Sequence, residues 1–155
     1  MGAFDPSSRR AYLFAVPPEV KTLPRVRDYM DKVVHTVRED TDIIVAVDIL
    51  LEHHITGAPV VNDANEVVGI LSEKDLLRLL AEGVDNEAAR GTVADFMTKQ
   101  VRTVTPNMNI LFCAGMFLGD VVRRFPVVEN GKLVGAITRF DILRGVRELG
   151  RSHKP

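Results

Sequence analysis

A nine-residue segment that occurs twice constrains the fold of this chain more than any other feature. Residues 69 to 77 read GILSEKDLL, and residues 135 to 143 read GAITRFDIL. Each copy places a hydroxyl residue three positions before an Asp, where an apolar segment gives way to a helical pattern. The spacing predicts that a strand ends and a helix begins, with Ser72 and Thr138 as caps and Asp75 and Asp141 in the first turns.

Two interpretations of these hydroxyl and carboxylate pairs are open. In the first, each pair is a capping box that satisfies the amides at a helix start and has no other role. In the second, both side chains point at the mouth of a cleft and hold a ligand. The spacing alone favours the cap, whereas the remainder of the repeat favours the ligand.

The repeat extends well beyond these segments. Matched positions are 67 residues apart before a predicted hairpin turn, as Thr36 and Thr103 are, and 66 apart after it, as Ser72 and Thr138 are. The matched pairs are Tyr29-Met30 with Phe96-Met97, Thr36-Val37 with Thr103-Val104, and residues 58–61 with 125–128. Each copy is predicted to form a strand, a helix, a strand, a tight turn, a strand and a helix. Two copies indicate a duplicated domain, because a solenoid needs three or more repeats.

The chain resembles a tandem pair of cystathionine-beta-synthase-type (CBS) domains, the arrangement called a Bateman module. The residues that carry the resemblance are APVV at 58–61 with GILSEKDLL, FPVV at 125–128 with GAITRFDIL, and the openings YMDKVVHTV and FMTKQVRTV. The resemblance covers residues 26 to 148. It implies an α+β fold of two β-α-β-β-α units packed sheet against sheet about a pseudo-twofold axis. It also implies two clefts between the units, which bind adenosine compounds in many relatives.

We therefore expect an N-terminal leader at 1–25, a first CBS unit at 26–81, a linker at 82–94, a second CBS unit at 95–150 and a tail at 151–155. A helix capped by Thr41 or Asp42 should run to about His54. Its predicted buried face is Ile43, Val47, Leu50 and Leu51, and that of the helix after Asp75 is Leu76, Leu77, Leu79 and Leu80.

Two adjacent histidines, His53 and His54, invite a metal-site interpretation that the sequence does not support. Neighbouring residues on a helix point about 100 degrees apart, and no Cys or Asp cluster nearby completes a ligand set. A favourable contact with the helix dipole is the better explanation, and no metal site is predicted.

The resemblance and the residue types together predict the nucleotide-binding residues. A carboxylate can accept hydrogen bonds from both hydroxyls of a ribose, a hydroxyl at a helix start can bind sugar or phosphate, and arginines can grip phosphate oxygens in a bidentate manner. Apolar residues beside these groups would enclose adenine. The predicted set is Thr36, Val37, Ala58, Pro59, Val60, Ser72 and Asp75 in the first copy, and Thr103, Val104, Arg123, Arg124, Phe125, Pro126, Val127, Thr138, Arg139 and Asp141 in the second.

The second copy is expected to be the better nucleotide site. Residues 1–81 contain 9 Lys or Arg and 13 Asp or Glu, a formal charge of −4, whereas residues 82–155 contain 11 and 8, a charge of +3. Arg123 and Arg124 replace Thr56 and Gly57 of the first copy, so a polyphosphate fits the second half better. Lys74 and Arg139, which precede the two aspartates, are either phosphate contacts or exposed helix residues.

Composition limits the class of protein. The chain has 155 residues, of which 46% are hydrophobic, and its net charge of −1 gives no sign of wholesale nucleic-acid binding. Its single cysteine, Cys113, excludes an intrachain disulfide, which fits the cytoplasm. The sequence contains no Walker loop, HExxH or GxSxG, so no enzyme activity, required cofactor or membrane association is predicted.

The segment 110–118, ILFCAGMFL, is apolar nearly all round and too short to span a bilayer. It is predicted to be a helix buried on more than one side, against the sister unit or in a homodimer through Phe112, Met116 and Phe117. The favoured function is a stand-alone regulatory module that binds AMP, ADP, ATP or a related adenosyl ligand. The alternatives are a ligand-free dimerisation scaffold and, more weakly, nucleic-acid binding through the arginines of residues 123–151.

Overall fold

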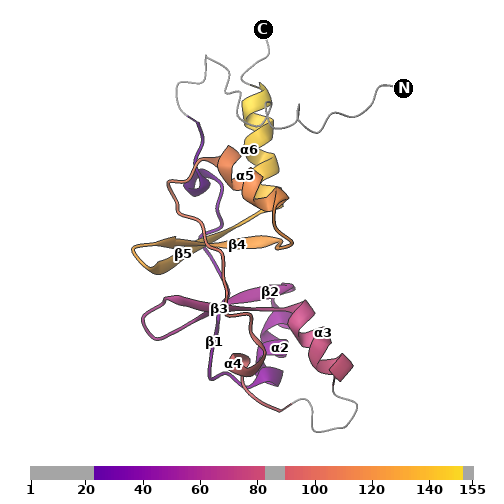
Figure 1. Ribbon diagram of the computed structural model, residues 1–155. Coiled ribbons are helices and arrows are strands. Elements are labelled where there is room, and N and C mark those ends of the chain that lie inside the picture. The colour runs from indigo at the N-terminus through magenta and orange to yellow at the C-terminus, as the bar shows by residue number, and fades with distance from the viewer. Residues whose placement is uncertain (1–22, 83–89, 152–155) are drawn as a thin grey trace, which may run out of the picture. The chain divides into compact units, whose positions relative to one another are not determined.

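The fold mixes helices and strands, as an α+β protein does, in the computed structural model, which describes residues 23–82 and 90–151 (Figure 1). Most of the predicted leader, part of the predicted linker and most of the tail therefore lie outside the described residues. The elements in chain order are η1 (Val26–Asp28), β1 (Val37–Arg38), α2 (Ile43–Glu52), β2 (Gly57–Val61), β3 (Val67–Ser72), α3 (Glu73–Glu82), α4 (Val93–Phe96), α5 (Ile110–Leu118), β4 (Arg124–Glu129), β5 (Lys132–Thr138) and α6 (Arg139–Arg151).

The chain divides into two compact units that do not follow the order of the sequence repeats. Unit A contains the described residues of 31–103 together with 126–136, and unit B contains those of 1–30, 104–125 and 137–155. The residues that open the first repeat thus pack in unit B, and those that open the second repeat, including α4, pack in unit A. Each unit depends on a segment supplied by the other repeat.

Unit A is built on a three-stranded sheet in the order β1-β2-β3. β1 runs parallel to β2, with Val37 opposite Val60, and β2 runs antiparallel to β3. The helices α2 and α3 lie on the same face of this sheet (Figure 1). The core between them consists of buried apolar residues, which are Val37, Ile43, Ala46, Leu50, Ala58, Val60, Leu71, Val93 and Met97.

The helix α2 begins at the predicted cap, because the Asp42 side chain accepts hydrogen bonds from the amides of Ile44 (2.9 Å) and Val45 (3.4 Å). It buries Ile43 and Leu50 as predicted, but Leu51 is 67% exposed. Leu51 follows Leu50 by about 100 degrees around the helix, which turns it away from the sheet. The prediction that Leu51 is buried was therefore wrong.

The helix α3 shows the same error at one position. Leu79 is buried and Leu76 packs partly against the core, but Leu77 is 63% exposed. A stripe of consecutive leucines is wider than the face that a helix can bury against one sheet. The side chain of Leu80 lies outside the described residues.

Unit B contains α5 and α6, which pack against each other (Figure 1). α5 spans the nine residues predicted, between Asn109, which caps it through the Leu111 amide at 2.8 Å, and Gly119. Its inner side chains Ile110, Cys113 and Phe117 are buried, but Phe112 is 57% exposed and Leu118 is 76% exposed. Within unit B, α5 is therefore buried along one side.

The strand predicted to open the second repeat is shorter than its counterpart β1. Among residues 101–108, only Val104 forms a β-bridge. Pro106 follows two positions later, and a proline has no amide hydrogen with which to continue a ladder. The Pro106 carbonyl instead accepts a hydrogen bond from the Arg27 amide at 3.0 Å.

Both predicted hairpin turns form, and their residues adopt left-handed backbone conformations at Asn65 (φ 59°), Asn130 (φ 51°) and Gly131 (φ 77°). Within unit A the first turn binds to β5. The Leu133 amide donates to the Asn65 carbonyl at 3.0 Å, and the Asn65 side-chain amide donates to the Leu133 carbonyl at 3.1 Å. This contact explains why residues 126–136 belong to unit A.

Candidate functional site

In unit A, the first hydroxyl and carboxylate pair is a capping box. The Oδ2 atom of Asp75 accepts hydrogen bonds from the Ser72 amide at 2.8 Å and the Ser72 hydroxyl at 2.7 Å. The Asp75 amide donates back to the Ser72 hydroxyl at 3.4 Å. Asp75 is 7% exposed, so its carboxylate is buried and hydrogen-bonded at the start of α3.

A third donor reaches Asp75 from the opening segment of the second repeat. The Thr98 hydroxyl donates to Oδ1 of Asp75 at 3.3 Å, and Thr98 pairs with Ile70 through two backbone hydrogen bonds of 2.9 Å. A side chain at Gly69 would meet the Sδ atom of Met97 at 2.5 Å. The glycine that opens the motif therefore lets this segment lie against β3 and brings Thr98 to the carboxylate.

In unit B, Asp141 repeats this cap at the start of α6. Its Oδ2 atom accepts from the Thr138 amide and hydroxyl, both at 2.8 Å, and the Asp141 amide donates to the Thr138 hydroxyl at 3.3 Å. Asp141 is 8% exposed. Its Oδ1 atom, however, accepts from the Arg144 guanidinium at 2.7 Å, which is an ion pair.

The predicted cap is therefore confirmed at both motifs, and the two motifs differ in charge. Asp75 is satisfied by neutral donors, whereas Asp141 is paired with a cation three residues along the same helix. Sequence reasoning missed both Thr98 and Arg144. A signal for Arg144 was present, because residues three apart on a helix are neighbours, but Arg78 has the same spacing from Asp75.

The apolar residues predicted to enclose adenine are core residues. The exposed fraction is at most 2% for Val37, Ala58, Val60, Val104, Phe125 and Val127. Pro59 and Pro126 are also buried, Thr36 is half-buried, and Thr103 is exposed. In unit B the Phe125 ring packs against that of Phe117, with centroids 4.5 Å apart. The side chains of this set therefore stabilise the sheets, and a role in binding adenine stays a prediction.

The predicted phosphate contacts of unit B lie at the first residue of α6 and in the segment that leads into β4. Arg139, the first residue of α6, donates to the Asp120 carbonyl at 3.3 Å. The Asp120 side chain in turn accepts from the Val122 amide at 3.2 Å. These bonds hold the loop that leads to the exposed Arg123 and the half-buried Arg124. Three guanidinium groups are thus contributed by two adjacent segments.

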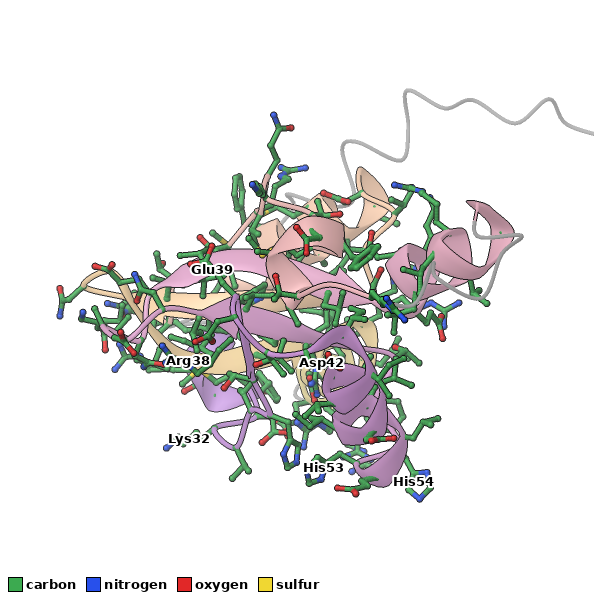
Figure 2. All side chains as sticks on the ribbon, turned by 90° about the horizontal axis from the view of Figure 1, so that it is seen from below. Lys32, Arg38, Glu39, Asp42, His53 and His54 are labelled. Atoms are coloured by element: carbon green, nitrogen blue, oxygen red, sulfur yellow. The ribbon has the colours of Figure 1, made fainter. Side chains whose placement is uncertain are left out.

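Two histidines of unit A, His35 and His53, stack on each other. The His53 ring lies against that of His35, with centroids 3.6 Å apart and planes inclined by 16°. Figure 2 shows Asp42 at one end of α2 and both His53 and His54 at the other. Residues 23–82 and 90–151 contain no group of three or more His, Cys, Asp or Glu residues placed to hold a metal ion.

Comparison with protein families assigns two CBS domains to this chain, at residues 26–82 and 93–148. The chain belongs to the CBS-domain family. The tandem CBS pair inferred from the two motifs is thereby confirmed.

Two CBS-domain relatives indicate how far the similarity extends. The chloroplastic CBS domain-containing protein CBSX2 of Arabidopsis thaliana is 30% identical over 185 residues, which cover 96% of this chain and 78% of the relative. An uncharacterized protein of Methanocaldococcus jannaschii, MJ1225, is 34% identical over 119 residues, which cover 77% of this chain and 41% of that protein. This chain therefore spans less than half the length of MJ1225.

Solved structures of CBS pairs share the fold. The crystal structure of CBSX2 in complex with AMP matches with a TM-score of 0.72 and 32% identity, covering 82% of this chain and 98% of that one. The CBS pair of protein MJ0100, in complex with 5′-methylthioadenosine and S-adenosyl-L-methionine, matches with a TM-score of 0.70 and 26% identity over the same shares of the chains. Neither α3 nor any other helix in the described part of this CBS-domain chain has the length and apolar character needed to cross a membrane.

Proposed function

We propose that this CBS-domain protein is a regulatory module that binds an adenine nucleotide of the AMP, ADP or ATP class, or a related adenosyl ligand, through its two hydroxyl and carboxylate motifs. The observation that carries the proposal is the pair of nearly buried aspartates, Asp75 and Asp141, each fixed in the first turn of a helix. The adenosine compounds in the CBSX2 and MJ0100 structures support the choice of ligand class.

The acceptor capacity of each carboxylate suits a ribose. A carboxylate offers about four lone-pair positions. Asp75 receives hydrogen bonds from two donors of Ser72 and from Thr98. Asp141 receives two from Thr138 and one from Arg144. Each carboxylate keeps a position for a sugar hydroxyl, and the adjacent helix start favours a negatively charged phosphate.

The motif in unit B is proposed as the stronger site for a phosphorylated ligand. Arg139 lies at the start of α6, and its contact with Asp120 holds the loop that carries Arg123 and Arg124. Guanidinium groups bind phosphate oxygens through short, charge-assisted hydrogen bonds. We expect affinity to rise from adenosine to AMP, ADP and ATP, and to fall with added salt.

Thermal unfolding with adenosine, AMP, ADP, ATP and S-adenosylmethionine tests the proposal. A ligand at about 100 times its dissociation constant adds about 2.7 kcal/mol to the free energy of unfolding. For a chain of this size the melting temperature should rise by roughly 5 to 11 °C. If none of the five compounds raises the melting temperature or gives heat in calorimetry, the nucleotide proposal is wrong.

A matched pair of variants separates ligand binding from helix capping. Asp141→Asn keeps an oxygen for the Thr138 amide but removes the charge, and we expect affinity to fall about ten- to a hundredfold, or about 1.5 to 3 kcal/mol. Asp95 is the control, because it caps α4 through the Thr92 amide at 2.8 Å but belongs to neither motif. Asp95→Asn should change stability and leave affinity unaltered.

A second candidate function, a homodimeric scaffold, is favoured by the exposed apolar side chains of unit B. On α5 and α6 these are Phe112, Leu118, Phe140, Leu143 and Val146, which are between 49% and 76% exposed. The equivalent positions Val45, Leu51 and Leu77 of the first repeat are also exposed. Surfaces of this kind often mark contacts between proteins.

We also keep the cytoplasm as the proposed compartment, because the single thiol of Cys113 is free and buried.

Sedimentation equilibrium over a range of concentrations tests the scaffold. We expect a dimer for the native sequence and a monomer for Leu143→Arg, since a charge in the centre of an apolar contact opposes association. A native chain that stays monomeric at micromolar concentrations would rule out this contact without affecting the nucleotide proposal.

A further inference from the structure

Arg144 joins the Asp141 motif to the start of the described chain. Its Nη2 atom donates to Oδ1 of Asp141 at 2.7 Å and to the backbone carbonyl of Tyr29 at 2.8 Å. The Arg144 side chain is 46% exposed, whereas that of Asp141 is only 12% exposed. One guanidinium nitrogen therefore bridges a proposed ribose acceptor and a backbone segment more than a hundred residues away in sequence.

The segment that Arg144 holds, residues 23–30, is docked in unit B by backbone hydrogen bonds. The Val26 amide donates to the Met108 carbonyl at 2.9 Å, and the Ile110 amide donates to the Pro24 carbonyl at 3.0 Å. The side chain of Val26 is fully buried. The hydrogen bond from Arg144 to the Tyr29 carbonyl ties this segment to α6.

The Tyr29 side chain completes the contact. Its hydroxyl donates to Glu148, and its ring lies so close to Gly145 that an added Cβ atom there would be 3.3 Å from Cε2. Unit A has Phe96 in place of Tyr29 and Leu79 in place of Gly145. Since phenylalanine has no hydroxyl, the hydrogen bond from Tyr29 to Glu148 in unit B has no counterpart at Phe96 in unit A.

We propose that Arg144 couples ligand occupancy at Asp141 to the docking of residues 23–30. Asp141 already accepts three hydrogen bonds, so one of about four acceptor positions remains. A ribose that donates both vicinal hydroxyls to this carboxylate must displace one present donor. The displaced donor is Arg144, whose long, half-exposed side chain can turn to water, whereas the Thr138 amide and hydroxyl are fixed by the cap. The hold of Arg144 on the Tyr29 carbonyl then weakens, and residues 23–30 loosen.

This inference rests on the proposed function and adds the sign of the coupling, in which ligand binding at Asp141 loosens residues 23–30. Because coupling between two sites is reciprocal, weakening the Arg144 contact must also strengthen ligand binding. Arg144 is thus a positioning residue that opposes the ligand. A purely structural arginine would instead leave affinity unchanged or lower it when replaced.

Hydrogen exchange of the full chain with adenosine measures the release directly. Adenosine has the ribose diol without a phosphate charge, so its effect reports on Asp141 rather than on the surrounding arginines. We expect the amides of Val26, Arg27 and Tyr29 to exchange faster when adenosine is bound, while those of Ile70 and Thr98 in unit A do not. Binding with unchanged exchange at residues 26–30 overturns the coupling and leaves the proposed function intact. No binding of any adenosine compound overturns both.

Two pairs of variants extend the test. Arg144→Met should raise adenosine affinity by about fivefold or more, the lower range of common coupling energies, whereas Arg78→Met, its counterpart on α3, should not. Without ligand, Asp141→Asn should speed exchange at residues 26–30, and Asp75→Asn should not. An Arg144→Met variant that is folded by circular dichroism but binds adenosine equally or more weakly contradicts the proposal.

Discussion

Asp75 and Asp141 cap the starts of α3 and α6 in the same way, but their electrostatic surroundings differ. Both carboxylates accept hydrogen bonds from the amide and the hydroxyl of the residue three positions before them. The third donor is the neutral Thr98 for one and the cation Arg144 for the other. The cap could be predicted because it depends on residues adjacent in sequence. The third donor could not, because Thr98 arrives through the packing of a distant segment and Arg144 was one of two arginines at equal spacing.

Burial of Cys113 gives the protein a measurable response to alkaline pH. Its side chain is fully buried, and burial raises the pKa of the thiol from 9.0 to about 11. Between these values the unfolded chain loses a proton that the folded chain keeps, so stability is complete below pH 9 and falls as pH rises towards 11. We expect a loss on the order of 1 to 3 kcal/mol in the free energy of unfolding. Cys113→Ala should remove this part of the decline in urea titrations at pH 8.5 to 11.

Tyr29 extends the same response to higher pH. Burial, together with the hydrogen bond to Glu148, raises the pKa of Tyr29 from 10.0 to about 12. The folded chain therefore keeps the phenol proton longer than the unfolded chain, and stability falls between pH 10 and 12. Tyr29→Phe should be less stable near neutral pH, having lost the Glu148 contact, and less sensitive to pH above 10. Equal slopes for both proteins above pH 10 would contradict this assignment.

At the scale of the elements, apolar periodicity located the helices well and their buried faces less well. α5 was predicted over its full length from the apolar run 110–118, and the structure caps it with Asn109 and ends it at Gly119. Leu51 and Leu77 were wrongly placed in the core, because neighbouring leucines look alike in sequence although a helix buries only one side. The strand at Val104 is short because Pro106 has no amide hydrogen to continue the pairing. The Pro106 carbonyl accepts a hydrogen bond from the Arg27 amide instead.

The packing of α6 against Tyr29 can be tested with two glycines of the same helix. A Cβ atom at Gly145 would lie 3.3 Å from both Ile110 and Tyr29, whereas Gly150 has nothing within 4 Å. Gly145→Ala should therefore lower the free energy of unfolding by about 1 to 3 kcal/mol. Gly150→Ala should leave it equal or raise it by up to about 1 kcal/mol, since alanine favours a helix. Chemical denaturation of both variants decides; equal effects would mean that Gly145 is not closely packed.

At the scale of the whole molecule, the two compact units do not correspond to the two sequence repeats. Residues 23–30 open the first repeat but lie in unit B, and α4 opens the second repeat but lies in unit A. The sequence predicted the duplication and the CBS family, because those follow from matched residues. It could not predict this exchange, since the two repeats have similar openings and only their contacts decide which unit each one joins.

Removal of residues 1–30 should therefore damage a distant part of the chain. The deletion takes away Val26, Tyr29 and the backbone bonds to Met108 and Pro106, all in unit B. We expect hydrogen exchange to become faster in α5 and α6, while α2 and the sheet of unit A keep their protection. A deletion that affects α2 more than α6 would be inconsistent with this division into units.

The docking of residues 23–30 also sets an order of events during synthesis. This segment leaves the ribosome before the rest of unit B, but its partners Met108, Arg144 and Glu148 emerge only after unit A has been almost fully translated. Until then Val26 and Tyr29 remain without the surfaces that bury them, and closing so long a loop slows folding. Residues 23–30 of the nascent chain should consequently stay open to chaperone binding until residues 144–148 have been synthesised.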